Sequence, residues 1–154
     1  MATMDERLAY ADRVAGVWAA RYRVAPMTGR IAGYLYVCDP ASQGIDELAA
    51  ALQASRSAVV GGVKVLESRG LVRRTRSAGE RADRVSIVFD ASRGFDPAPY
   101  TEAAELAEAG LALVAESNHE QRALLEETAS LNAHLAERLP LLLDEWRAGR
   151  GAGR

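Results

Sequence analysis

The sequence contains little cysteine, lysine or aromatic residue. Its one cysteine, Cys38, excludes a disulfide within the chain and fits a reducing compartment. Lys64 is the only lysine, so arginine carries nearly all of the positive charge. Aromatic residues make up 6% of the chain, and we therefore expect Leu, Val and Ala to form most of the core.

Long hydrophobic runs and catalytic motifs are also missing. No apolar stretch approaches the ~20 residues of a membrane span, and residues 1–6 do not begin a signal peptide, which predicts a cytoplasmic protein without a membrane contact. There is no phosphate-binding glycine loop, nucleophile elbow or carboxylate pair, so we expect neither an enzyme nor a cofactor. His119 and His134 lack further ligands at a suitable spacing, so no metal site is expected.

Apolar residues at three- and four-residue spacing predict two helices near the N-terminus, over residues 5–22 and 28–38. The second should end at Asp39-Pro40, because a residue before proline avoids helical geometry. Residues 100–147 show the same spacing. There we expect two helices with a break between residues 116 and 130, and a kink or new turn at Pro140.

Between these regions the pattern predicts a helix pair and then a β-hairpin. A short helix over 45–53 follows the N-cap Gly44, and a longer helix follows the N-cap Ser55 and runs to Arg69, before the C-cap Gly70. The longer helix places three apolar residues inward: Val59, Val63 and Leu66. Two strand candidates come next, over 71–76 and 85–89, and a linker over 90–99.

This order predicts a mainly α fold with a small β-hairpin wing, that is, a winged helix-turn-helix DNA-binding domain flanked by N- and C-terminal helices. We divide the chain into an N-terminal helix (1–26), the winged helix-turn-helix (27–92), a C-terminal helical region (93–148) and a disordered tail (149–154).

Charge is distributed unevenly, although the net charge of the chain is only −2. Residues 55–84 contain eight basic and three acidic side chains, whereas residues 100–145 contain two basic and ten acidic ones. Charged residues often do no more than solvate a surface. Here the basic segment coincides with the helix pair and hairpin, which favours contact with DNA phosphates.

The second helix of the pair would lie in the major groove. Opposite its apolar stripe it carries five residues that we expect to meet DNA: Arg56, Ser57, Val60, Gly61 and Lys64. Gly61 and Gly62 are each unfavourable inside a helix by ~1 kcal/mol relative to alanine. Close approach to DNA or to a neighbouring helix would explain them, and so would neutral drift.

Several segments resemble the winged-helix regulators of the MarR type. They are Gly-Ile-Asp-Glu-Leu-Ala at 44–49, Ser-Arg-Ser at 55–57 and Val-Lys-Val-Leu-Glu-Ser-Arg-Gly-Leu-Val-Arg-Arg at 63–74. The wing segment Gly-Glu-Arg-Ala-Asp at 79–83 is similar to the branch that includes GbsR. The resemblance covers residues 28–89, whereas the flanking helices match in layout only.

The resemblance implies a homodimer that reads a pseudo-palindrome in double-stranded DNA, with residues 1–26 and 93–148 as its dimerisation helices. Arg81 would be the wing arginine in the minor groove, steadied by Asp83 and Glu80. From the basic segment we also expect Arg74 and Arg76 to bind DNA. The chain departs from the GbsR branch, which often has polar residues at three positions of the recognition helix: Ala58, Val60 and Gly62. We therefore expect readout to depend on shape and phosphate contacts.

Two further groups have alternative interpretations. Cys38 is either a buried structural residue, which we favour, or an oxidation sensor, although no basic neighbour in sequence lowers its pKa. Aromatic side chains either pack in the core, which we favour, or line an effector pocket able to hold a quaternary ammonium ligand. The candidates for that pocket are Trp18, Tyr22, Tyr34 and Tyr36.

The sequence thus predicts a dimeric transcriptional regulator, a repressor by resemblance, that responds to a small-molecule effector of unknown identity. The alternative is a winged-helix protein-interaction module that uses its acidic helices and does not bind DNA.

Overall fold

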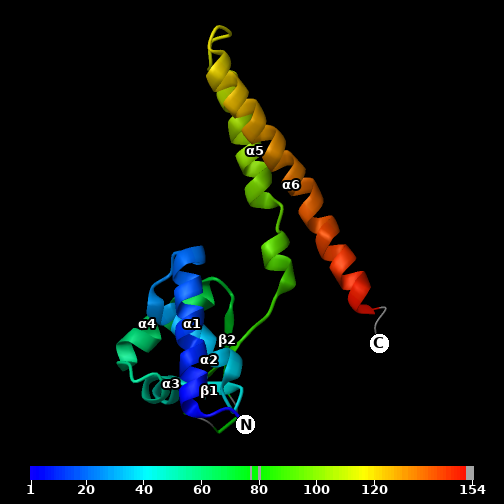
Figure 1. Cartoon of the computed structure of the whole chain (residues 1–154). Coiled ribbons are helices and arrows are strands. Elements are labelled where there is room, and N and C mark those ends of the chain that lie inside the picture. The colour runs from blue at the N-terminus through cyan, green and yellow to red at the C-terminus, as the bar shows by residue number, and fades with distance from the viewer. Residues whose placement is uncertain (77, 80, 152–154) are drawn as a thin grey trace. The chain divides into compact units, whose positions relative to one another are not determined.

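The computed structural model describes residues 1–76, 78–79 and 81–151. They form two compact units, residues 1–89 and 90–154, the second described as far as Gly151 (Figure 1). The boundary at Phe89 lies slightly before the one expected at residue 92. The helix over residues 4–22, expected to be a separate dimerisation element, belongs to the first unit.

Two closely packed helices open the first unit: α1 (Met4–Tyr22) and α2 (Pro26–Val37). Gly29 and Gly33 bring their backbones together, because a Cβ at Gly29 would lie 2.9 Å from the Cα of Ala15, and one at Gly33 would lie 2.8 Å from the Cα of Ala11. Both predicted helices are confirmed, and the second already begins at Pro26, where the missing N–H costs nothing.

The predicted helix pair is confirmed as α3 (Ile45–Ala51) and α4 (Arg56–Ser68). The Ser55 hydroxyl accepts a hydrogen bond from the amide of Ala58 at 3.2 Å, as expected of an N-cap. The first helix ends earlier than predicted, because Gln53 adopts a left-handed φ of 51° and the amide of Ala54 bonds the carbonyl of Ala49.

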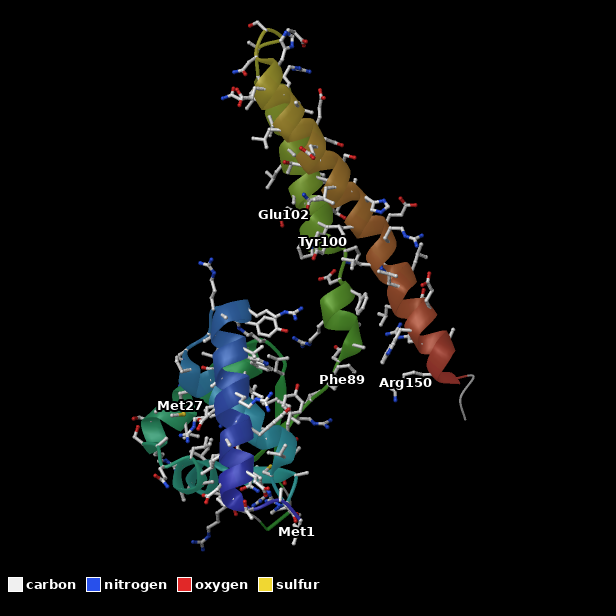
Figure 2. The ribbon with its side chains drawn as sticks, in the orientation of Figure 1. Met1, Met27, Phe89, Tyr100, Glu102 and Arg150 are labelled. Atoms are coloured by element: carbon white, nitrogen blue, oxygen red, sulfur yellow. The ribbon has the colours of Figure 1, made fainter. Side chains whose placement is uncertain are left out.

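A three-stranded antiparallel sheet completes the first unit, with the order β1 (Ser42–Gly44), β3 (Arg84–Ile87), β2 (Val72–Thr75). The β2–β3 hairpin is the predicted wing. The sequence analysis missed β1, since its three residues Ser-Gln-Gly carry no strand pattern. Phe89, expected to be half-buried in a strand, lies beyond β3 and is 74% exposed (Figure 2).

The core of the first unit lies between α2, α3, α4 and the sheet. The predicted inward residues Val59, Val63 and Leu66 are fully buried there. They pack in one cluster with Ile31 and Leu48, so the inner face of α4 is fixed by apolar contacts.

The second unit is a helical hairpin of α5 (Ala98–Leu111) and α6 (His119–Gly151), preceded by a 3₁₀ turn, η1 (Ala91–Phe95). The break between the helices begins at Ala112, earlier than predicted. Pro140 lies inside α6 without ending it, so no new helix starts there. The helix also extends through residues 149–151, which were expected to be disordered, whereas residues 152–154 of the expected tail lie outside the described residues.

None of the helices that the structure describes combines the length and the apolar character needed to cross a membrane.

Candidate DNA-binding face

The outer face of α4 carries most of the predicted contact residues. Arg56, Ser57, Gly61 and Lys64 are exposed, so their side chains or backbone are accessible to a ligand. Val60 is only partly exposed and packs against the core cluster. This packing restricts the contact that Val60 could make with a thymine methyl group.

The two glycines of α4 have different environments. A Cβ at Gly62 would lie 2.5 Å from the Cδ1 of Ile31, so this glycine allows α2 and α4 to approach closely. A Cβ at Gly61 would meet nothing within 4 Å. Close approach to a neighbouring helix therefore explains Gly62, whereas no contact among the described residues explains Gly61.

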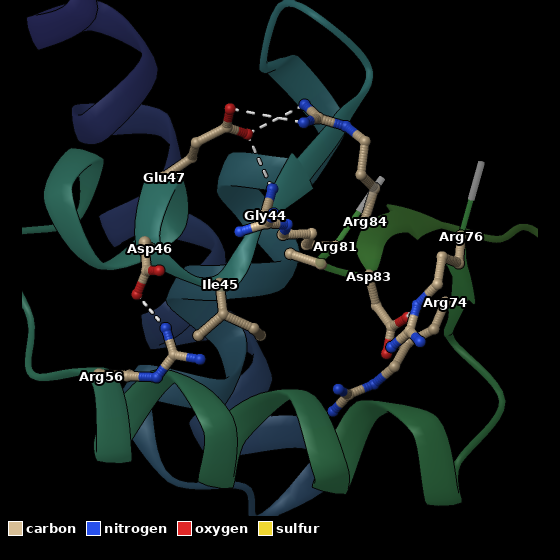
Figure 3. A pocket seen from close by; sticks show the side chains of 11 residues that line it. Gly44, Ile45, Asp46, Glu47, Arg56, Arg74, Arg76, Arg81, Asp83 and Arg84 are labelled. Carbon is tan, nitrogen blue, oxygen red and sulfur yellow. Dashed lines mark hydrogen bonds and ion pairs between the residues drawn. The ribbon is translucent and has the colours of Figure 1, made fainter. Parts of the chain in front are cut away.

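A cleft of about 530 Å³ lies between the N-terminal ends of α3 and α4 and the wing (Figure 3). Five arginines line it: Arg56, Arg74, Arg76, Arg81 and Arg84. Three carboxylates also line it: Asp46, Glu47 and Asp83. The fold thus gathers four predicted basic residues, Arg56, Arg74, Arg76 and Arg81, into one basic concavity beside the recognition helix.

Carboxylates from the same unit pair with four of these arginines. Arg56 pairs with Asp46, the first-turn residue of α3. The Nε of Arg74 lies 2.8 Å from the Oε1 of Glu67 on α4.

The third pair corrects an expectation about the wing. The Nε of Arg76 donates to the Oδ1 of Asp83 at 2.8 Å, so Asp83 steadies Arg76 and not Arg81. Glu80, the other expected support, lies outside the described residues. Arg81 is exposed and has no hydrogen-bond or ion-pair partner in the part of the chain that the structure describes.

Arg84 joins the wing to the helix pair, a role that the sequence analysis missed. Its Nη2 donates to the carbonyl of Ser42 at 2.6 Å and to the Oε2 of Glu47 at 2.9 Å. Glu47 Oε2 also accepts the amide of Gly44 at 2.8 Å. This amide and then Arg84 hold the pKa of Glu47 below its ordinary value. The only sequence signal was Glu47 three residues after the N-cap Gly44, the spacing of a capping box.

The four aromatic residues proposed for an effector pocket do not line a common cavity among those described. Trp18 and Tyr22 contact edge to face with ring centroids 5.3 Å apart. Tyr34 is 3% exposed and belongs to the core, whereas Tyr36 is 45% exposed. Trp18 also lines a hollow of about 230 Å³, but the other lining residues all lie on α1.

Burial raises the pKa of the Cys38 thiol, and its Sγ lies 3.6 Å from the carbonyl of Leu35. A raised pKa lowers the fraction of reactive thiolate, which supports a structural role. In the described ranges, no three His, Cys, Asp or Glu side chains group as metal ligands would.

Comparisons with known proteins show similarity to transcriptional regulators. Residues 97–149 match the family model described as MmpR5-like MarR family transcriptional regulator. Over 138 residues the chain is 26% identical to the HTH-type transcriptional regulator MmpR5 of Mycobacterium tuberculosis, covering 88% of this chain and 83% of the relative. These relatives are regulators of transcription, and neither match singles out the GbsR branch.

A solved structure shares the fold. A crystal structure of a transcriptional regulator matches with a TM-score of 0.73 and 24% identity, covering 91% of this chain and 97% of that one. A complex of Staphylococcus aureus MepR with DNA matches with a TM-score of 0.44 and 20% identity, covering 85% and 88%. The chain thus combines a winged helix-turn-helix with a basic cleft, and it is similar to transcriptional regulators of the MarR type.

Proposed function

We propose that the protein is a homodimeric, ligand-responsive repressor that acts in the cytoplasm on a pseudo-palindromic operator. The observation that carries its DNA contact is the cleft with five arginines beside the exposed face of α4. A helix whose inner face is fixed by core contacts can present its outer face to the major groove. The cleft would then lie against the phosphates next to that groove.

Dimerisation is supported by the apolar surface of the second unit. Large apolar side chains on α5, α6 and the turn between them remain exposed in the single chain: Leu106, Leu113, Leu124, Leu131, Leu141, Leu142 and Trp146. Exposed leucines repeated along one helical hairpin are typical of a surface that another chain covers. A second copy would supply the second reading unit that a pseudo-palindrome requires.

We also propose that a small-molecule effector regulates the protein, and the division of the chain into two units supports this. A ligand that changes the spacing of two reading units would alter DNA affinity without touching DNA. The aromatic residues named above do not identify its site. The similarity of residues 79–83 to the GbsR branch stays a prediction.

Fluorescence anisotropy with duplexes from the promoter region of the protein's own gene tests DNA binding. Arg81→Ala and Lys64→Ala should each weaken binding and reduce the slope of log K against log salt by about one. Arg138→Ala, on the exposed surface of α6, is the control and should leave both quantities unchanged.

If Arg81→Ala and Lys64→Ala both bind like the wild type, the assigned face is wrong. Failure of the wild type to bind any duplex at low salt, together with a stable protein partner in a pull-down, would instead favour the protein-interaction module.

A further inference from the structure

The ion pairs of the cleft differ in how firmly they hold their arginines. Arg84 and Arg74 are 25% and 28% exposed and pair with Glu47 and Glu67. Arg84 also bonds the β1 backbone, so it is part of the framework. The guanidinium groups of Arg84 and Arg74 are therefore held by partners within the protein.

Arg56 and Asp46 form the most exposed pair of the cleft. Their side chains are 63% and 83% exposed, and the pair joins the first turns of α3 and α4 (Figure 3). An ion pair in this setting contributes little to stability, since water and salt screen it and both side chains lose freedom. The pair can therefore open at low cost.

The Asp46 carboxylate pairs with the guanidinium group of Arg56, which lies at the N-terminus of the recognition helix α4. A phosphate would be attracted to the same place, both by Arg56 and by the free amides of that helix end. A carboxylate already there reduces the gain from the phosphate, because Arg56 must first exchange one anion for another. It also repels the approaching backbone.

We infer that Asp46 is an affinity-limiting residue: its carboxylate competes with DNA phosphate for Arg56 and lowers binding to every duplex by the same factor. This inference rests on the proposed DNA-binding function. Since the competition involves the DNA backbone and no base, it sets the strength of binding and leaves the preference between sequences unchanged.

The test is Asp46→Asn, measured by anisotropy on a promoter duplex and a scrambled duplex over a salt series. Affinity should rise about three- to eightfold at 0.1 M salt on both duplexes, and the salt slope should steepen by up to one, as expected for one additional phosphate contact. The ratio between the duplexes should not change. Asp46→Glu keeps the negative charge and should bind both duplexes with wild-type affinity.

Asp12→Asn is the matched control. Asp12 is an exposed aspartate whose Oδ1 lies 2.6 Å from the Nε of Arg30 on α2, so the substitution removes the same charge from an ion pair away from the cleft. It should leave DNA affinity within twofold of the wild type. In an Arg56→Ala background, Asp46→Asn should also gain less than twofold, because the guanidinium is gone.

Three results would overturn the inference. Weaker or unchanged binding by Asp46→Asn would make Asp46 a residue that positions Arg56 or one without influence. An equal gain in the Arg56→Ala background would show that Arg56 is not involved. If the wild type binds no duplex at all, the proposed DNA-binding function itself is wrong. That result differs from the first two, in which the wild type binds DNA and only the role of Asp46 is wrong.

Discussion

At the scale of single residues, α4 contains two adjacent glycines with opposite constraints. Gly62 faces Ile31 across a gap too small for a methyl group, and Gly61 faces open space. Sequence reasoning found that both are costly in a helix but could not separate them, because the difference depends on which side of the helix packs against α2.

Gly61→Ala should stabilise the protein by about 0.5–1 kcal/mol, since alanine costs less conformational entropy in a helix and meets no neighbour. Thermal unfolding should show a higher melting temperature. Gly62→Ala is the matched comparison, with the same gain in helix propensity offset by overpacking against Ile31 of about 1–3 kcal/mol. Equal stabilisation by both substitutions would refute the packing difference.

Glu47 should give stability a dependence on acid pH. Its pKa in the folded protein lies below the ordinary value of 4.5, first because of the Gly44 amide and then because of Arg84. A depressed carboxyl pKa stabilises the fold fully above the unfolded value, and this stabilisation is lost as the pH falls through the folded value. Chemical denaturation from pH 7 to pH 3 should therefore show a smaller loss of stability for Glu47→Gln than for the wild type. If the free energy of unfolding falls equally with pH in Glu47→Gln and in the wild type, the Glu47 carboxylate does not contribute to this pH dependence.

At the scale of elements, periodicity and capping residues predicted each helix of the first unit and the hairpin. The inner residues of α4 were correct because apolar spacing directly determines which face is buried. The strand β1 was not predictable, since Ser42, Gln43 and Gly44 acquire strand geometry only by pairing with β3. Similarly, the positions of basic residues did not reveal which carboxylate each one meets, which is why Asp83 was assigned to Arg81 and not to Arg76.

Arg84 is expected to hold the wing base against α3. Arg84→Lys keeps the charge but cannot reproduce the fork that reaches both Ser42 and Glu47. It should lower the free energy of unfolding by about 1–2 kcal/mol and weaken DNA binding without changing the salt slope. Arg73→Lys, at an exposed position of β2, should change neither stability nor affinity. A reduced salt slope for Arg84→Lys would instead indicate a direct phosphate contact.

At the scale of the whole molecule, the second unit has more exposed leucine than a solvated hairpin requires. We predict that Leu131→Glu, at a side chain 57% exposed in the single chain, shifts the protein from dimer to monomer in sedimentation velocity. DNA affinity should fall at least tenfold, because one reading unit then binds alone. Glu126→Gln, on an exposed and already polar position of α6, should leave the dimer intact. A wild-type monomer at micromolar concentration would exclude this assembly.

The tight contact between Gly62 and Ile31 also bears on how such a regulator can acquire new operators. On the proposed function, α4 presents one face to DNA and packs with the other, so a new sequence preference would come from exchanging side chains on the exposed face. At Gly61 a longer side chain would have room, because an added Cβ meets no described atom within 4 Å. On the proposed function, polar substitutions at this position would alter the choice of operator and leave the framework unchanged.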